Sequence, residues 1–243
     1  MNVAYIVLGN NSFTGRLPQS WFNSTISLNK LNFLDISSNS LTGTIPSLQN
    51  LIKLGYAVFA DNQFVGTLPN TAYPSNLSTI AFFNNKLTGS IPSQLLQLSY
   101  LKLVALQNNS LNGTITSFKS NYLAYLGLND NEFSGKLPNI NNNMIVLSLY
   151  NNKFTGTIPN FNTFVNLTQV YLQNNSLIGA IPLVPPTIHV LNLAYNRLGS
   201  TISSSILQCQ YLTQLILNNN MLTGTTTTTS TTSTAIIILM HTT

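Results

Sequence analysis

The chain has 243 residues, and 44% of them are apolar, which is enough for a substantial core and excludes disorder caused by low hydrophobicity. Only 5% are charged, against roughly 25% in ordinary soluble domains. The 35 asparagines, with many Ser and Thr, must therefore supply most of the polar surface in place of charged residues. The net charge is +5, but the basic residues are scattered singly, which argues against a nucleic-acid partner.

A unit of 21 to 28 residues recurs along the whole chain, and one Asn marks each copy. The pattern is Leu-x-x-Leu-x-Leu-x-x-Asn-x-Leu-x-Gly-x-Ile-Pro, complete at residues 31–46 and 167–182. The ten units fill residues 1–224, which we assign to one repeat domain. The marker asparagines are Asn11, Asn39, Asn62, Asn85, Asn109, Asn131, Asn152, Asn175, Asn196 and Asn220.

Each unit predicts the same series of elements. Before the marker, apolar and polar residues alternate with period two, which predicts a short strand with Leu inward. Stacked units would pair these strands in parallel and share one core. The marker amide is expected to turn inward and bond unpaired backbone groups. The Gly that follows is expected to supply a turn or a close approach, and the Pro an edge or bend.

Four units depart from the pattern. The first interval carries an insertion around residues 22–31, Thr116 replaces the Pro of the fifth unit, the ninth unit has its Gly displaced to Gly199, and the tenth dissolves into Thr after Gly224. Cys209 aligns with a core leucine, so we expect a buried, unreactive thiol.

Residues 225–243 form a separate tail. Ten consecutive Thr or Ser residues predict a flexible or O-glycosylated stalk, and an apolar run follows at residues 235–240. This run is either the start of a truncated membrane segment or a non-native end, and the sequence does not separate the two. No secretory signal is present.

The repeat resembles the leucine-rich repeat, and its Leu-Thr-Gly-x-Ile-Pro half, at residues 41–46 and 87–92, looks like the plant-specific subclass of receptor-like kinases, receptor-like proteins and polygalacturonase-inhibitor-type wall proteins. The resemblance implies an α/β repeat solenoid: a curved right-handed coil with a concave parallel β-sheet and an irregular or 3₁₀ convex side. It also implies an extracellular or cell-surface setting. The cysteine-paired caps usual in the subclass are missing, so we expect a piece of a longer ectodomain or a shortened gene model.

Catalytic chemistry is poorly supported. Asp61 and Asp130 lie three repeats apart, roughly 14 Å at the strand spacing, too far for a glycosidase pair. Asp130 and Glu132 flank a marker Asn without a third group, and Cys209 and His189 would have to act through the core. Neither a metal cluster nor a phosphate loop is present, so we expect no enzyme and no cofactor.

What remains is the outward surface of the predicted strands. Exposed aromatic residues on a rigid sheet give contact area at low entropic cost. We therefore expect a ligand site for a protein, peptide or polysaccharide on the concave face; the alternative is that the rings only shield strand backbone. The predicted ligand-binding residues are Tyr5, Phe33, Tyr56, Phe83, Tyr125, Tyr150 and Tyr171.

Two other functions stay open. A ladder of hydroxyl residues after the conserved Gly would suit an ice-binding or matrix protein: Thr44, Thr67, Ser90, Thr114, Thr157, Thr201 and Thr225, interrupted by Arg16, Lys136 and Ala180. The chain could also be the ectodomain of a receptor kinase, with membrane attachment at or beyond its C-terminal end. Glycosylation sequons, which permit an extracellular setting, occur at Asn10, Asn23, Asn76, Asn108, Asn112, Asn166 and Asn174.

Overall fold

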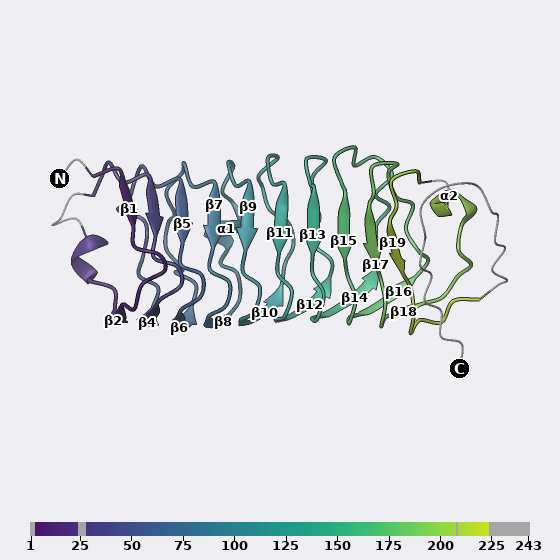
Figure 1. Ribbon diagram of the computed structural model, residues 1–243, viewed down its shortest axis with the longest axis horizontal. Coiled ribbons are helices and arrows are strands. Elements are labelled where there is room, and N and C mark those ends of the chain that lie inside the picture. Colours follow the sequence, from purple (N-terminus) through teal and green to yellow (C-terminus); the bar gives the residue numbers. More distant parts are fainter. Residues whose placement is uncertain (1–2, 24–27, 208, 224–243) are drawn as a thin grey trace.

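The computed structural model describes residues 3–23, 28–207 and 209–223. The repeats stack side by side along the long axis of the molecule, in chain order (Figure 1). This is the parallel-strand solenoid that the repeat predicts. The expected tail at residues 225–243 lies outside the described residues. Among those residues, no helix has both the length and the apolar character needed to cross a membrane.

The predicted strands form one ten-stranded parallel sheet in which each strand pairs with that of the next unit. The register joins equivalent residues, so that Leu126 lies between Val104 and Leu147. We call the outer face of this sheet the concave face. Its strands are β1 (Tyr5–Val7), β3 (Phe33–Asp35), β5 (Tyr56–Val58), β7 (Thr79–Ala81), β9 (Leu103–Ala105), β11 (Tyr125–Gly127), β13 (Val146–Ser148), β15 (Gln169–Tyr171), β17 (Val190–Asn192) and β19 (Gln214–Ile216).

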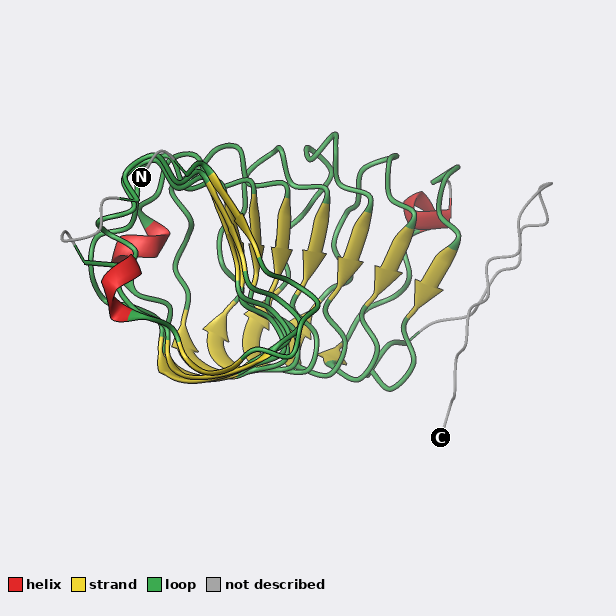
Figure 2. Ribbon diagram, turned by 60° about the vertical axis from the view of Figure 1, so that its left-hand side comes forward, coloured by secondary structure: helices red, strands yellow, loops and turns green. Residues whose placement is uncertain are grey.

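A second parallel sheet, which the sequence analysis did not predict, follows the marker asparagines. The two rows of strands are distinct in Figure 2. Gly is depleted in strands, so the Leu-x-Gly segment gave no strand signal. Its nine strands are β2 (Thr14–Arg16), β4 (Ser40–Thr44), β6 (Gln63–Thr67), β8 (Lys86–Gly89), β10 (Ser110–Thr114), β12 (Glu132–Lys136), β14 (Lys153–Thr157), β16 (Ser176–Gly179) and β18 (Arg197–Leu198).

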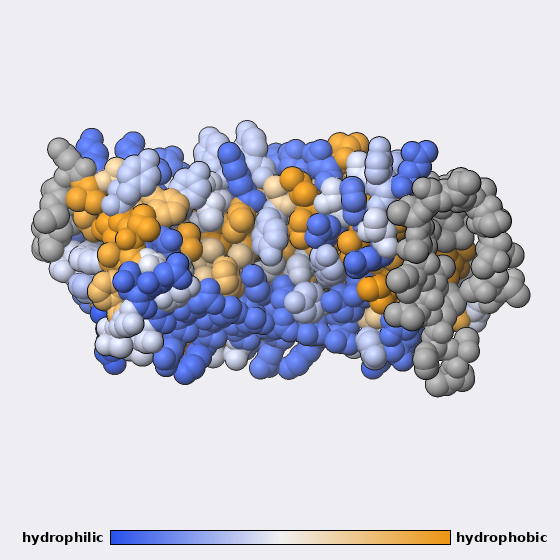
Figure 3. Space-filling view, viewed as in Figure 1, coloured by the Kyte–Doolittle hydropathy of each residue, from blue (hydrophilic) through white to orange (hydrophobic). Residues whose placement is uncertain are grey.

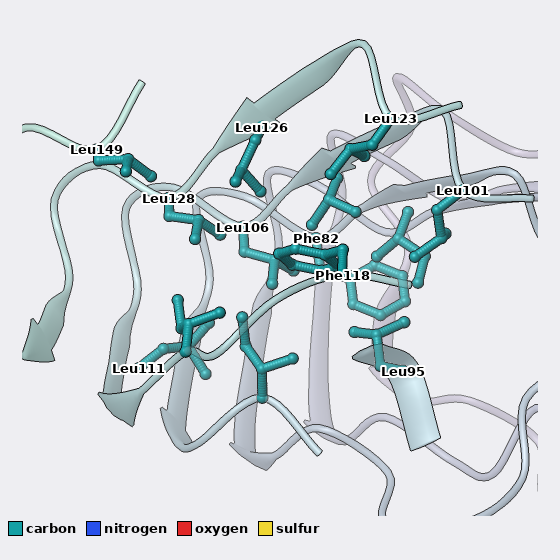
Figure 4. Packing of buried hydrophobic residues seen from close by; sticks show 14 of the residues in the cluster. Phe82, Leu95, Leu101, Leu106, Leu111, Phe118, Leu123, Leu126, Leu128 and Leu149 are labelled. Carbon is teal, nitrogen blue, oxygen red and sulfur yellow. The ribbon is translucent and has the colours of Figure 1, made fainter. Parts of the chain in front are cut away.

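Leucines and phenylalanines of successive units fill one continuous core between the sheets and the convex side. Figure 4 shows the leucines of neighbouring coils, among them Leu106, Leu128 and Leu149, following one another along the spine. Phe59 packs on Phe82 of the next coil with ring centroids 4.9 Å apart. Because each apolar layer is covered by the adjacent coil, no unit buries its own core face alone.

The marker asparagines bond inward, as predicted. The Nδ2 group of Asn131 donates to the carbonyls of Leu106, Leu128 and Asn129 at 3.0 to 3.2 Å. Its Oδ1 atom accepts the backbone N–H of Leu111 at 2.9 Å. One amide thus satisfies backbone groups in its own coil and in the preceding one, which is a structural role.

The convex side is mostly loop, with a 3₁₀ turn η1 (Gln19–Trp21) and the short helices α1 (Ser93–Leu96) and α2 (Ser204–Leu207). Cys209 packs against the core but is only partly buried, so the prediction of a buried thiol was too strong. Burial still raises its pKa, which keeps the thiol protonated and unreactive. In the ninth unit, Ser200 stands where the other units have Gly, and β18 has only two residues.

Candidate functional site

The seven predicted aromatic residues separate into two groups on the concave face. Tyr5, Phe33 and Tyr56 are equivalent residues of β1, β3 and β5, paired in register. Their rings form a row with centroids 6.3 and 5.5 Å apart. Tyr5 keeps 68% of its surface exposed and Tyr56 keeps 41%. This row is a shallow aromatic strip rather than a pocket.

The other four, Phe83, Tyr125, Tyr150 and Tyr171, line one hollow of about 510 Å³. The hollow extends across the strands from the end of β7 to β17. Amide and hydroxyl side chains complete its wall, a part of the site that the sequence analysis did not identify. The full lining is Phe83, Asn84, Gln107, Asn108, Tyr125, Asn129, Ser148, Tyr150, Tyr171, Gln173 and Asn192.

Asp130 is the charge centre beside this hollow. Its carboxylate accepts the Nδ2 groups of Asn129 and Asn151, at 2.7 and 2.6 Å. Tyr150 lies close enough for the Asp130 charge to act on its hydroxyl. Desolvation by burial raises the pKa of Tyr150, and the Asp130 charge raises it further, so that Tyr150 remains a neutral donor.

Two amide oxygens in the wall of the hollow have no partner. In the described part of the chain, Gln107 Oε1 and Gln173 Oε1 are the buried side-chain N or O atoms that lack a hydrogen bond. Gln107 Oε1 and the Tyr125 hydroxyl both lie over Gly127, where a Cβ would meet them at 2.9 and 3.0 Å. Because Gly127 has no side chain, the Gln107 amide oxygen and the Tyr125 hydroxyl can both occupy the space above it.

Amide ladders border the concave face at the residue before each marker. Asn84 donates to Asp61 and Asn108 donates to Asn84, both at 2.6 Å. A second ladder runs from Asn174 through Asn151 to Asp130, with the same spacing. All of these residues have positive φ, near 50° to 55°, which Asn and Asp tolerate better than most residues. Each ladder ends on a carboxylate, which can only accept.

The concave face carries no positive charge in its described rows. The outward strand positions and the two residues before each marker include Asp35, Asp61 and Asp130 but no Lys, Arg or His. Five of the nine basic residues instead lie in the second sheet: Arg16, Lys86, Lys136, Lys153 and Arg197. Glu132, the fourth acidic residue, is there too and pairs with Lys153 at 2.9 Å. Charge is thus segregated between the two sheets.

The hydroxyl ladder of the sequence analysis lies on this second sheet. Thr44, Thr67, Ser90, Thr114 and Thr157 are all exposed at the ends of its strands. Hydrophilic residues form a band along the lower edge of Figure 3, where β2 to β12 lie. Thr201 comes after the short β18, and Thr225 lies outside the described residues.

His189 and Cys209, which the sequence analysis considered as a nucleophile pair, each contact ring or backbone neighbours of their own. The His189 ring stacks on Tyr211 at 5.7 Å, and its Nδ1 atom lies 2.8 Å from the Thr187 carbonyl oxygen. Cys209 Sγ faces the carbonyls of Pro185 and Ser205. The described residues contain no group of three His, Cys, Asp or Glu side chains that could hold a metal ion.

The seven sequons occupy different environments, although each Asn is exposed. Asn108 and Asn174 donate through Nδ2, the atom to which an N-linked glycan attaches, to the ladders described above. Asn10 occupies the equivalent turn in the first unit. Asn112 lies in β10, and Asn23, Asn76 and Asn166 lie in loops. Use of these sites stays a prediction.

A sequence model of the Leucine Rich Repeat family matches residues 30–51 and 143–162. These two segments are leucine-rich repeats, and the solenoid as a whole resembles the solved ectodomains of plant leucine-rich repeat receptors. It superposes on the plant peptide hormone receptor RGFR1, solved with RGF2, with a TM-score of 0.74 and 29% identity over 90% of this chain and 40% of that one. The ectodomain of the Arabidopsis receptor kinase HAESA, solved with an IDA peptide hormone, superposes with a TM-score of 0.69 and 33% sequence identity. The match covers 88% of this chain and 41% of the HAESA chain.

A plant ice-binding protein has the same fold, with a TM-score of 0.77 over 90% of this chain and 73% of that one. Its sequence is only 23% identical. No curated protein matches this leucine-rich repeat chain in sequence. The chain spans about two fifths of the length of the RGFR1 and HAESA structures.

Proposed function

We propose that this leucine-rich repeat protein is a non-catalytic recognition module that binds a protein or peptide ligand on its concave face. The observation that carries the proposal is the hollow, where four aromatic rings from separate repeats meet buried polar atoms. Apolar surface with a few convergent polar groups is typical of binding sites. The peptide complexes of RGFR1 and HAESA support this ligand class over a polysaccharide. By the same analogy, the module belongs to an extracellular receptor-like or wall-associated protein.

The test is a selection of binders from a random peptide library displayed on phage. We expect peptides recovered on the wild-type chain to lose binding to a Tyr125→Ala/Tyr150→Ala variant. The matched control is Tyr100→Ala/Tyr122→Ala, which removes a stacked pair, 6.1 Å between centroids and just over half exposed, that does not line the hollow. Circular dichroism checks that both variants fold. Peptides that bind all three chains equally would refute the site.

The ice-binding alternative rests on the hydroxyl ladder of the second sheet. The Cγ2 methyl groups of Thr44, Thr67, Thr114 and Thr157 each point to the Gly of the next coil, 2.9 to 3.0 Å from where its Cβ would be. This contact fixes the side chains in one orientation and aligns their hydroxyls at the strand spacing of about 4.8 Å. Lys136 interrupts the row.

Thermal hysteresis of the folded protein tests this alternative. An ice-binding face predicts a measurable freezing-point gap that Thr67→Lys and Thr157→Lys abolish and that the concave variants leave intact. A wild-type chain without hysteresis would remove the alternative and leave the recognition proposal unaffected.

A further inference from the structure

Five of the side chains that line the hollow already use a donor within the protein. The Nδ2 groups of Asn84, Asn108 and Asn129 are all committed to neighbouring side chains. The hydroxyls of Ser148 and Tyr171 are committed as well, to Asn129 and Gln169. The buried side-chain atoms left without a partner in the described residues are both oxygens. A ligand donor that reaches either oxygen would pair a buried acceptor that is otherwise costly to leave unpaired.

The charges around the hollow also favour a ligand that donates hydrogen bonds. Asp130 stands beside it with two amide donors but without a cation, and none of the described concave rows contains a basic residue. The lining rings of Phe83, Tyr125, Tyr150 and Tyr171 present π-faces or edges to the same space. Aromatic rings with a nearby carboxylate attract ammonium and guanidinium groups. The Asp130 carboxylate would repel an anionic group of a ligand.

We propose that the hollow binds a lysine or arginine side chain presented by a protein or peptide ligand, with Asp130, Gln107 and Tyr150 as its principal contacts. Gln107 and Asp130 belong to adjacent units, so their side chains begin about 5 Å apart along the sheet. A single guanidinium, with five donors, can serve both. Gln173, two units beyond Asp130, accepts a second donor from the same ligand.

This inference rests on the proposed function. The charge of the selected peptides tests the cationic ligand separately from the recognition function. The probe is the phage-displayed random library, selected on the wild-type chain. We expect one strongly enriched Lys or Arg position, and about tenfold weaker binding when that residue is replaced by Gln. Neutral or acidic peptides that depend on Tyr125 and Tyr150 would keep the recognition proposal and overturn the cationic one. A selection without any such dependence would overturn both.

Asp130→Asn is the decisive variant, because Asn tolerates the positive φ of 55° at this position and removes only the charge. The matched control is Asp61→Asn, which neutralises the carboxylate that ends the other ladder, at the edge of the hollow and two units before Gln107. Calorimetry should show that Asp130→Asn weakens the selected peptide about tenfold and that Asp61→Asn leaves it unchanged. Equal effects, or none, would contradict the proposal.

Gln107→Glu adds a negative charge to the hollow instead of removing one. It tests the proposal if Asp130→Asn fails to fold. It places a second carboxylate where the unpaired oxygen now lies. We expect tighter binding of the basic peptide at about 0.05 M salt, with most of the gain lost at about 0.5 M, where charges are screened. Weaker binding at low salt would overturn the assignment of a cation to this position.

Discussion

A pair of Gly and Thr residues joins neighbouring units of the second sheet at four interfaces between coils. Gly89 has a φ of 76°, in the left-handed region, and a Cβ there would lie 2.9 Å from the Thr67 methyl group. Gly15 has a similar φ of 80° but nothing within 4 Å. Gly is therefore favoured at this position for two separate reasons. The backbone has a positive φ, and the side chain of the preceding coil comes too close to leave room for a Cβ.

These two glycines predict different costs for the same substitution. Gly15→Ala should lose only the conformational term, about 1 to 2 kcal/mol. Gly89→Ala should lose that term and a further 1 kcal/mol or so, because the methyl contact between coils must open. Urea unfolding of both variants measures the difference. Equal losses would show that the close approach contributes nothing.

At the scale of a strand, the contribution of a side chain to stability depends on whether a neighbouring coil covers it. Phe133 and Phe13 occupy the same repeat position, two residues after the marker. Phe133 is completely buried and stacks on Phe154 at 6.4 Å, whereas Phe13 is 46% exposed. The same residue type therefore belongs to the core in β12 and to the surface just before β2.

We expect Phe133→Ala to lower the free energy of unfolding by about 3 to 5 kcal/mol, the usual cost of a large cavity. Phe13→Ala should cost under about 1 kcal/mol, since little area is removed from contact. Chemical denaturation followed by fluorescence or circular dichroism compares the two. A Phe13 variant as unstable as the Phe133 variant would mean that burial does not decide the role of this position.

Across the whole molecule, stability should fall in alkali. Burial raises the pKa values of Tyr73, Tyr125, Tyr150 and Cys209 above their ordinary values. Above about pH 10 the unfolded chain loses these protons while the folded chain keeps them, so unfolding releases protons and its free energy falls as pH rises. Below about pH 8 both states are protonated and these groups have no effect.

Tyr73 should contribute most to this decline, because it is almost fully buried and its hydroxyl donates to the Pro69 carbonyl at 2.9 Å. Urea unfolding of the wild type and of Tyr73→Phe at about pH 8 and about pH 11 tests this. The substitution should lower stability slightly at the lower pH and flatten the dependence between the two. Parallel curves would contradict the assignment.

The sequence by itself determined the coil, its ten strands, the inward Leu residues and the bonding of the marker Asn. The reason is that these properties depend on the period and the alternation of residue types, which local sequence carries. It also indicated the seven aromatic residues, since their outward position follows from strand parity alone.

Only the tertiary structure decided which outward residues share a site. Tyr5, Phe33 and Tyr56 form an open strip, whereas Phe83, Tyr125, Tyr150 and Tyr171 meet in one hollow. The difference depends on side-chain direction: the Tyr125 hydroxyl lies over Gly127, and the Asn and Gln side chains of neighbouring coils close around it. The second sheet likewise required the stacked backbone, because Gly in the middle of each segment hides its strand character.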